Sequence, residues 1–105
     1  MNFYYDSTIL AAIDVSDQNY QFDIYAVFLI DGKKYWAFSA GCSCPTPFEE
    51  FTSVDQLSPL NRAHDFKSLE LAVKSGADGW GVRKGGDYRN VSLSDVNQFM
   101  RVARS

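Results

Sequence analysis

Three side chains in the sequence are of the types that bind metals or attack substrates: Cys42, Cys44 and His64, the one histidine. Two thiolates and an imidazole could supply most of a tetrahedral zinc shell. Structural zinc sites usually separate paired cysteines by two or more residues, whereas only Ser43 separates these, and the sequence has no second cysteine pair. We therefore expect no cofactor, and a small zinc-binding structural module stays the alternative hypothesis for these three residues.

The sequence gives little support for catalysis. A cysteine nucleophile needs a base within hydrogen-bond reach of the thiol, and His64 is the sole neutral candidate. Neither residue is surrounded by a signature that would stabilise a reaction intermediate. The adjacent carboxylates Glu49 and Glu50 indicate a solvated pair, because neighbouring side chains usually point apart. We expect that the protein is not an enzyme.

The most unusual stretch is GCSCPTPFEE, residues 41–50. Its two prolines fix φ and push the residues before them toward extended conformations. Such a loop loses little entropy on ordering and could present an aromatic anchor in a preset position, although a tight structural crossover needs the same geometry. We predict a partner-binding surface formed by this loop and by a tryptophan set among glycines: Cys42, Cys44, Pro45, Pro47, Phe48, Glu49 and Trp80.

The first half of the chain predicts the strands that position this loop. Residues 8–15, 20–30 and 33–40 are runs of apolar, β-branched and aromatic side chains. Asp31 and Gly32 separate the second run from the third. An Asp-Gly pair between two such runs predicts a hairpin with a type I′ turn, because both central residues need positive φ.

The hairpin register assigns each side chain to a face, because side chains alternate across a strand. Three cross-strand pairs follow: Ile30 with Lys33, Val27 with Trp36, and Tyr25 with Phe38. The members of each face are mostly apolar: Tyr25, Val27, Leu29, Trp36 and Phe38 on one side, and Ile24, Ala26, Phe28, Tyr35 and Ala37 on the other. Two apolar faces predict either a cover on each side or an interaction surface on one of them.

The second half predicts helices. Apolar residues recur at helical spacing over 65–75, with Asp65 as N-cap and Gly76 just beyond the end, and over 92–104, with Ser92 as cap. A short helical turn is expected at 53–56, ending before Pro59. The expected fold is a single α+β domain over 1–105, in which a small antiparallel sheet built on the central hairpin packs against two C-terminal helices.

The charge and hydropathy of the sequence limit the classes of partner that we expect. The net charge is −3, and the ten basic residues form no stripe, so we expect no nucleic-acid partner. The basic, glycine-rich stretch around Trp80, Arg83 and Lys84 has no phosphate-binding fingerprint. We also expect neither a signal peptide nor a membrane span, since the longest apolar run, 25–30, is far shorter than the ~20 residues a helix needs.

The motif at residues 41–49, with Asp14-Val15 and Tyr20–Asp23 before it and residues 53–60 after it, resembles a family of small uncharacterised proteins of actinobacterial phages. The matching positions in the motif are Gly41, Cys42, Ser43, Cys44, Pro45, Pro47, Phe48 and Glu49. The resemblance covers about residues 14–60 and does not reach the helical half. It implies a phage origin and synthesis in the host cytoplasm, and it implies no activity.

The expected function is that of a non-catalytic phage accessory protein that binds and modulates a host or phage protein, for example in host takeover or anti-defence. A virion-associated or self-assembling structural protein is the other alternative. The sequence leaves open whether the protein forms a homodimer, which protein it binds, and what covers the second face of the hairpin.

Overall fold

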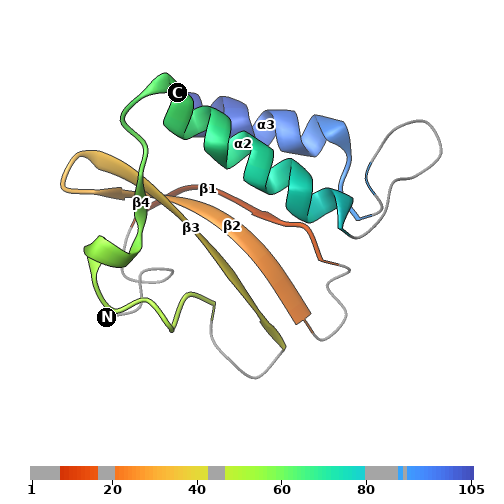
Figure 1. The fold of residues 1–105 in the computed structure, drawn as a ribbon, viewed down its shortest axis with the longest axis horizontal. Coiled ribbons are helices and arrows are strands. Elements are labelled where there is room, and N and C mark those ends of the chain that lie inside the picture. Colours follow the sequence, from red (N-terminus) through yellow and green to blue (C-terminus); the bar gives the residue numbers. More distant parts are fainter. Residues whose placement is uncertain (1–7, 17–20, 43–46, 80–87, 89) are drawn as a thin grey trace.

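The computed structural model describes residues 8–16, 21–42, 47–79, 88 and 90–105. They form an α+β fold in which an antiparallel sheet of order β1-β2-β3-β4 carries two helices on one face (Figure 1). The elements in chain order are β1 Thr8–Asp14, β2 Gln21–Ile30, β3 Lys33–Cys42, the 3-10 turn η1 Val54–Gln56, β4 Ser58–Pro59, α2 Ala63–Asp78 and α3 Leu93–Arg104. The expected fold class is confirmed.

The β2–β3 hairpin centres the sheet and has the predicted register. Asp31 and Gly32 take φ values of 53° and 76°, the positive values that a type I′ turn requires. The pairs Ile30–Lys33, Val27–Trp36 and Tyr25–Phe38 form as expected. This register places alternate hairpin side chains in two separate clusters, one on each face of the sheet.

The first cluster lies between the sheet and the helices. Tyr25 and Val27 from β2 and Ile13 from β1 face the buried apolar stripes of α2 and α3. Its fully buried helical members are Leu69 and Val73 of α2 and Val96 and Ala103 of α3. The apolar spacing read from the sequence predicted these stripes, because helical residues three and four apart share a face.

The second cluster answers the question of what covers the other face. Residues 47–57, which we call the strap, follow β3 and cross back beneath the hairpin (Figure 1). Phe48 and Leu57 of the strap are buried against Ile24, Ala26 and Phe28. The ring centroids of Phe48 and Phe28 lie 5.3 Å apart in an edge-to-face arrangement. One connecting segment therefore serves as the third layer.

The helix ends correct two sequence predictions. Asp65 is not the N-cap of α2 but lies in its first turn, where its Oδ2 accepts hydrogen bonds from the N–H groups of Asn61 and Arg62, each at 2.9 Å. These two bonds lower the pKa of the Asp65 carboxyl below its ordinary value. Gly76 does not end the helix, which continues to Asp78. Ser92, by contrast, caps α3 as expected, with its Oγ accepting from the N–H of Asp95 at 3.0 Å.

Two polar ties hold the helices to each other and to the sheet. Glu70 of α2 accepts a 2.9 Å hydrogen bond from Arg104 of α3 and another from Lys74. The two cations lower the pKa of Glu70. Lys34 of β3 donates from Nζ to the carbonyl of Ala103 at 3.0 Å, which places a cation at the C-terminus of α3. Among the described helices, none is long and apolar enough to cross a bilayer.

Candidate functional site: the groove between β1 and α3

The structure corrects the expected exposure of Phe48. Its side chain is fully buried, so in this structure the ring is part of the core and is not an exposed anchor. Ser39, itself buried, fixes the backbone there: its Oγ accepts from the N–H of Phe48 at 3.0 Å and donates to Oε1 of Glu50 at 2.7 Å. Phe48 has a φ of 65°, the left-handed region that a large side chain rarely adopts. The strap is therefore held in its turn by burial and by this buried hydroxyl.

The other residues of the predicted partner-binding surface have mixed outcomes. Pro47 is half-buried, Glu49 is exposed, and Cys42 ends β3. Three of the predicted residues, Cys44, Pro45 and Trp80, lie outside the described residues. No common surface of these residues can be drawn from the described part of the chain.

His64 lies in α2, whereas Cys42 ends β3. His64 is the second residue of α2 and follows Leu60 by four positions; the N–H of Leu60 donates to the carbonyl of Lys34 at 2.9 Å. Cys42 lies eight residues beyond Lys34 on β3, so at ~3.3 Å per residue Lys34 and Cys42 are about 26 Å apart along the strand. The imidazole is 70% exposed, and its Nε2 lies 3.2 Å from Oδ1 of Asp65. Within the described ranges, no three ligand-type side chains gather as a metal site would require.

The outer side of β1 is an edge of the described sheet. β1 is the end strand, and among the described residues no strand pairs with its far side. The N–H of Val15 donates to the carbonyl of Asp23, which fixes the alternation of the ladder. Since hydrogen-bonded and non-bonded pairs alternate in an antiparallel ladder, Ala12 and Asp14 direct their N–H and C=O groups away from β2. These groups can accept a further strand.

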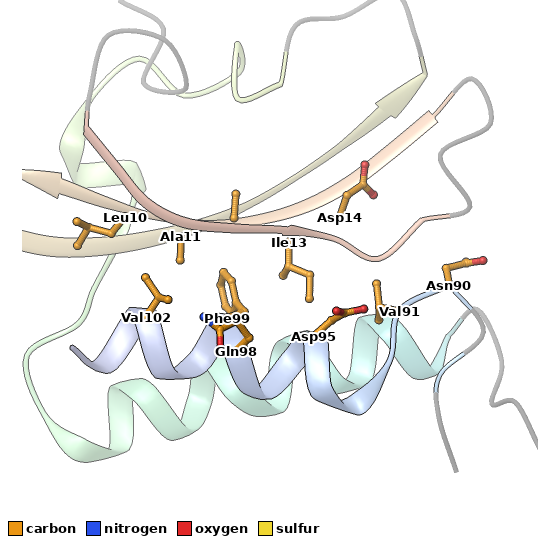
Figure 2. Close-up of a pocket in the computed structure, with 11 residues that line it drawn as sticks. Leu10, Ala11, Ile13, Asp14, Asn90, Val91, Asp95, Gln98, Phe99 and Val102 are labelled. Atoms are coloured by element: carbon orange, nitrogen blue, oxygen red, sulfur yellow. The ribbon is translucent and has the colours of Figure 1, made fainter. Parts of the chain in front are cut away.

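A groove of about 440 Å³ runs beside this edge, between β1 and α3. Ala11 and Ile13 point from the strand toward the helix, and Phe99 and Val102 point from the helix toward the strand (Figure 2). We call this feature the β1–α3 groove. Its lining residues come from two elements and from the segment before α3: Leu10, Ala11, Ala12, Ile13 and Asp14; Asn90 and Val91; and Asp95, Gln98, Phe99 and Val102.

The groove is chemically different at its two ends. Leu10 and Val102 lie at the apolar end, whereas Asp14, Asn90 and Asp95 lie at the other (Figure 2). Both ionisable residues of the lining are thus acidic, and they gather at one end. A groove with one apolar end and one acidic end has the shape and chemistry to receive an extended, partly apolar ligand in one orientation.

Two neutral networks hold the acidic end in place. Oδ1 of Asp14 accepts from the N–H and the Oγ of Ser16, at 2.9 and 2.6 Å, and from the N–H of Asp23 at 3.1 Å. Oδ2 of Asp95 accepts from the N–H of Ser92 at 3.0 Å. Because all of these donors are neutral, they orient the carboxylates without cancelling their negative charge.

Sequence reasoning did not find this site. The strand 8–15 was predicted, but nothing in the sequence says that it lies at the edge of the sheet or that α3 packs beside it. The available signal was indirect: the exposed Ala12 lies in a strand that ends in a carboxylate, Asp14. Long-range packing of residue 13 against residues 91–102 forms the groove, and no local pattern reports such packing.

The fold is that of a small α+β module with a groove at one edge of its sheet. The chain belongs to a family described as "Domain of unknown function (DUF7574)", whose model matches residues 2–80. The match therefore includes the whole sheet and α2, and it ends before α3. Comparison with curated proteins gives no match to this chain, and comparison with solved structures gives none either.

Proposed function

We propose that this chain is a non-catalytic protein-binding module that receives an extended segment of its partner along the outer edge of β1. In biological terms, it acts as a phage accessory protein that docks on a host or phage protein in the host cytoplasm and modulates it. The phage origin follows from the resemblance of the GCSCPTPFEE segment. The binding mode follows from the β1 edge.

One observation carries the proposal: the outer edge of β1, which no described strand pairs with, borders a groove with an apolar wall. Strand addition takes affinity from main-chain hydrogen bonds and specificity from pockets for alternate side chains. The β1 edge offers the first through the outward groups of Ala12 and Asp14. The β1–α3 groove offers the second through Ile13, Phe99 and Val102. Unpaired edges promote unwanted association, so an edge left open beside a groove favours a binding role.

Site-specific photocrosslinking tests this function. A photoreactive phenylalanine analogue replaces Ala12, which is exposed at the outer edge of β1, or Ser68, which is exposed on α2 and serves as the matched control. Each purified variant is irradiated in host lysate with and without phage infection, and the adducts are identified by mass spectrometry. We expect one dominant protein adduct from position 12 that is absent from position 68.

The alternatives give different products. Adducts removed by nuclease instead of protease would replace the protein partner by a nucleic acid. An adduct of the chain with itself would favour the self-assembling structural protein. Equal adducts from both positions, or none from position 12, would contradict the proposal that the β1 edge is the binding surface.

A further inference from the structure

We infer that the segment bound in the β1–α3 groove belongs to another protein, alternates apolar with polar side chains, and carries a Lys or Arg at the Asp14–Asp95 end. This inference rests on the proposed function, because it names the chemistry of the partner at the same surface. It follows from the backbone of β1, the groove's apolar wall and the placement of its charges.

The backbone of β1 sets the alternation. A strand that pairs with Ala12 and Asp14 extends the sheet, so its side chains point by turns to the helix side and to the opposite side. Every second side chain then enters the space between β1 and α3. The β1–α3 groove thus samples alternate residues of the bound segment.

The apolar wall selects those alternate residues. Ala11 and Ile13 face Phe99 and Val102 across the groove (Figure 2), and Leu10 extends the wall at the far end. A polar side chain placed among them would lose its hydration without a hydrogen-bonding partner, except near Gln98. Apolar side chains of moderate size are therefore the preferred occupants.

The two carboxylates at one end of the groove set the direction in which the segment binds. Asp14 and Asp95 are the ionisable groups of the lining, and within the described part of the chain no Lys or Arg forms an ion pair with either. The hydrogen bonds that they accept from the described residues come from neutral donors, so the described residues leave the charge of each carboxylate uncompensated at that end. A cation on the bound segment complements this end of the groove, and an anion there is disfavoured.

A second copy of the chain fits this groove less well. β1 has the sequence TILAAID, with no Lys or Arg, so edge-to-edge pairing of two copies supplies no cation to either acidic end. A basic and apolar segment of a different protein is the better match.

The test uses a short synthetic peptide in which Val alternates with Thr and one end carries Lys, in two versions with Lys at either terminus. A matched pair of peptides carries Glu in place of Lys. Binding to the intact chain is measured by fluorescence anisotropy, and the contact surface by amide chemical-shift changes. We expect a Lys peptide to bind and to shift the amides of β1 and α3, with affinity at least about tenfold above its Glu counterpart.

Three variants connect binding to the structure. Ala12→Pro removes the outward N–H of an edge position without removing a β1–β2 bond, and should abolish binding. Ser68→Ala, at an exposed position of α2 outside the groove lining, should bind normally. Asp95→Asn retains an oxygen acceptor for the N–H of Ser92 and should weaken binding about two- to fivefold, the range of an exposed ion pair.

The outcomes separate this inference from the proposed function. If no Lys peptide binds while crosslinking from position 12 still yields a partner, the partner chemistry is wrong and the function stands. Equal binding of Lys and Glu peptides would overturn the charge argument. A dimer of the wild-type chain, seen by light scattering and lost in Ala12→Pro, would show that a second copy occupies the edge and would overturn the inference. If both experiments fail, the function fails with them.

Discussion

Replacing Phe48 by alanine tests whether the strap covers the second face of the sheet in solution. The Phe48 ring is fully buried and lies edge-to-face with Phe28. The Phe51 ring also packs against Phe48, with centroids 5.9 Å apart. Truncation to a methyl group leaves a cavity in the smaller of the two clusters.

The size of the effect follows from this burial. Truncation of a buried phenylalanine costs about 3–5 kcal/mol, and each lost ring pair accounts for about 0.5–1.5 kcal/mol of such a loss. A domain of this length has a total stability of about 5–15 kcal/mol. Phe48→Ala is therefore expected to remove a large fraction of the free energy of unfolding, and Phe48→Leu, which fills much of the space, about 1 kcal/mol.

Urea unfolding followed by circular dichroism measures these changes. Phe38→Ala is the matched control, because its ring is 40% exposed on the other face and its loss should cost far less. With slopes of about 1–3 kcal/mol per molar urea, Phe48→Ala should shift the midpoint by at least about 1 M. If Phe48→Ala costs less than about 1 kcal/mol, or no more than Phe38→Ala, the strap does not bury this ring and the reasoning is refuted.

Two further substitutions test the contacts that hold each face. Ser39→Ala leaves the buried N–H of Phe48 without its acceptor and should cost about 1–3 kcal/mol in the same urea assay; a cost below about 0.5 kcal/mol would contradict the role given to this hydroxyl. Gly76→Ala should destabilise the protein despite a gain in helix propensity of about 1 kcal/mol, because a β-carbon there lies 2.4 Å from the hydroxyl of Tyr25. The loss should shrink in a Tyr25→Phe background, and a stabilised Gly76→Ala single variant would refute the clash.

The parts of the fold that the sequence predicted correctly are those that depend on local patterns. The Asp31-Gly32 turn and the alternation around it specify the hairpin register, because turn type and side-chain period are local properties. The apolar spacing and the Ser92 cap specify α3 in the same way. Both patterns operate over a few residues, so they survive in any tertiary context that buries the expected face.

Features that depend on distant residues were wrong or missed. Gly76 has the sequence context of a helix end, but α2 continues to Asp78, and the Tyr25 side chain of β2 packs closely against this glycine. The two-residue strand β4 pairs Pro59 with Tyr35, where the sequence predicted only the end of a turn. Phe48 lies in a segment whose composition predicted a binding loop, yet its side chain is buried against an apolar face of the hairpin. In each case the deciding contact is absent from the local sequence.

The strap also has a consequence for the order in which the chain assembles. All members of the second-face cluster lie within residues 9–57, and its buried residues lie within 24–57. The helix-side cluster, in contrast, joins residues 10–36 to residues 60–103, and the tie from Lys34 to Ala103 spans 69 positions. Closing shorter loops costs less chain entropy, so the hairpin and strap can form a local nucleus before the helices dock. The third layer, made from the segment that follows β3, thus completes one of the two cores with no residue from the C-terminal helix.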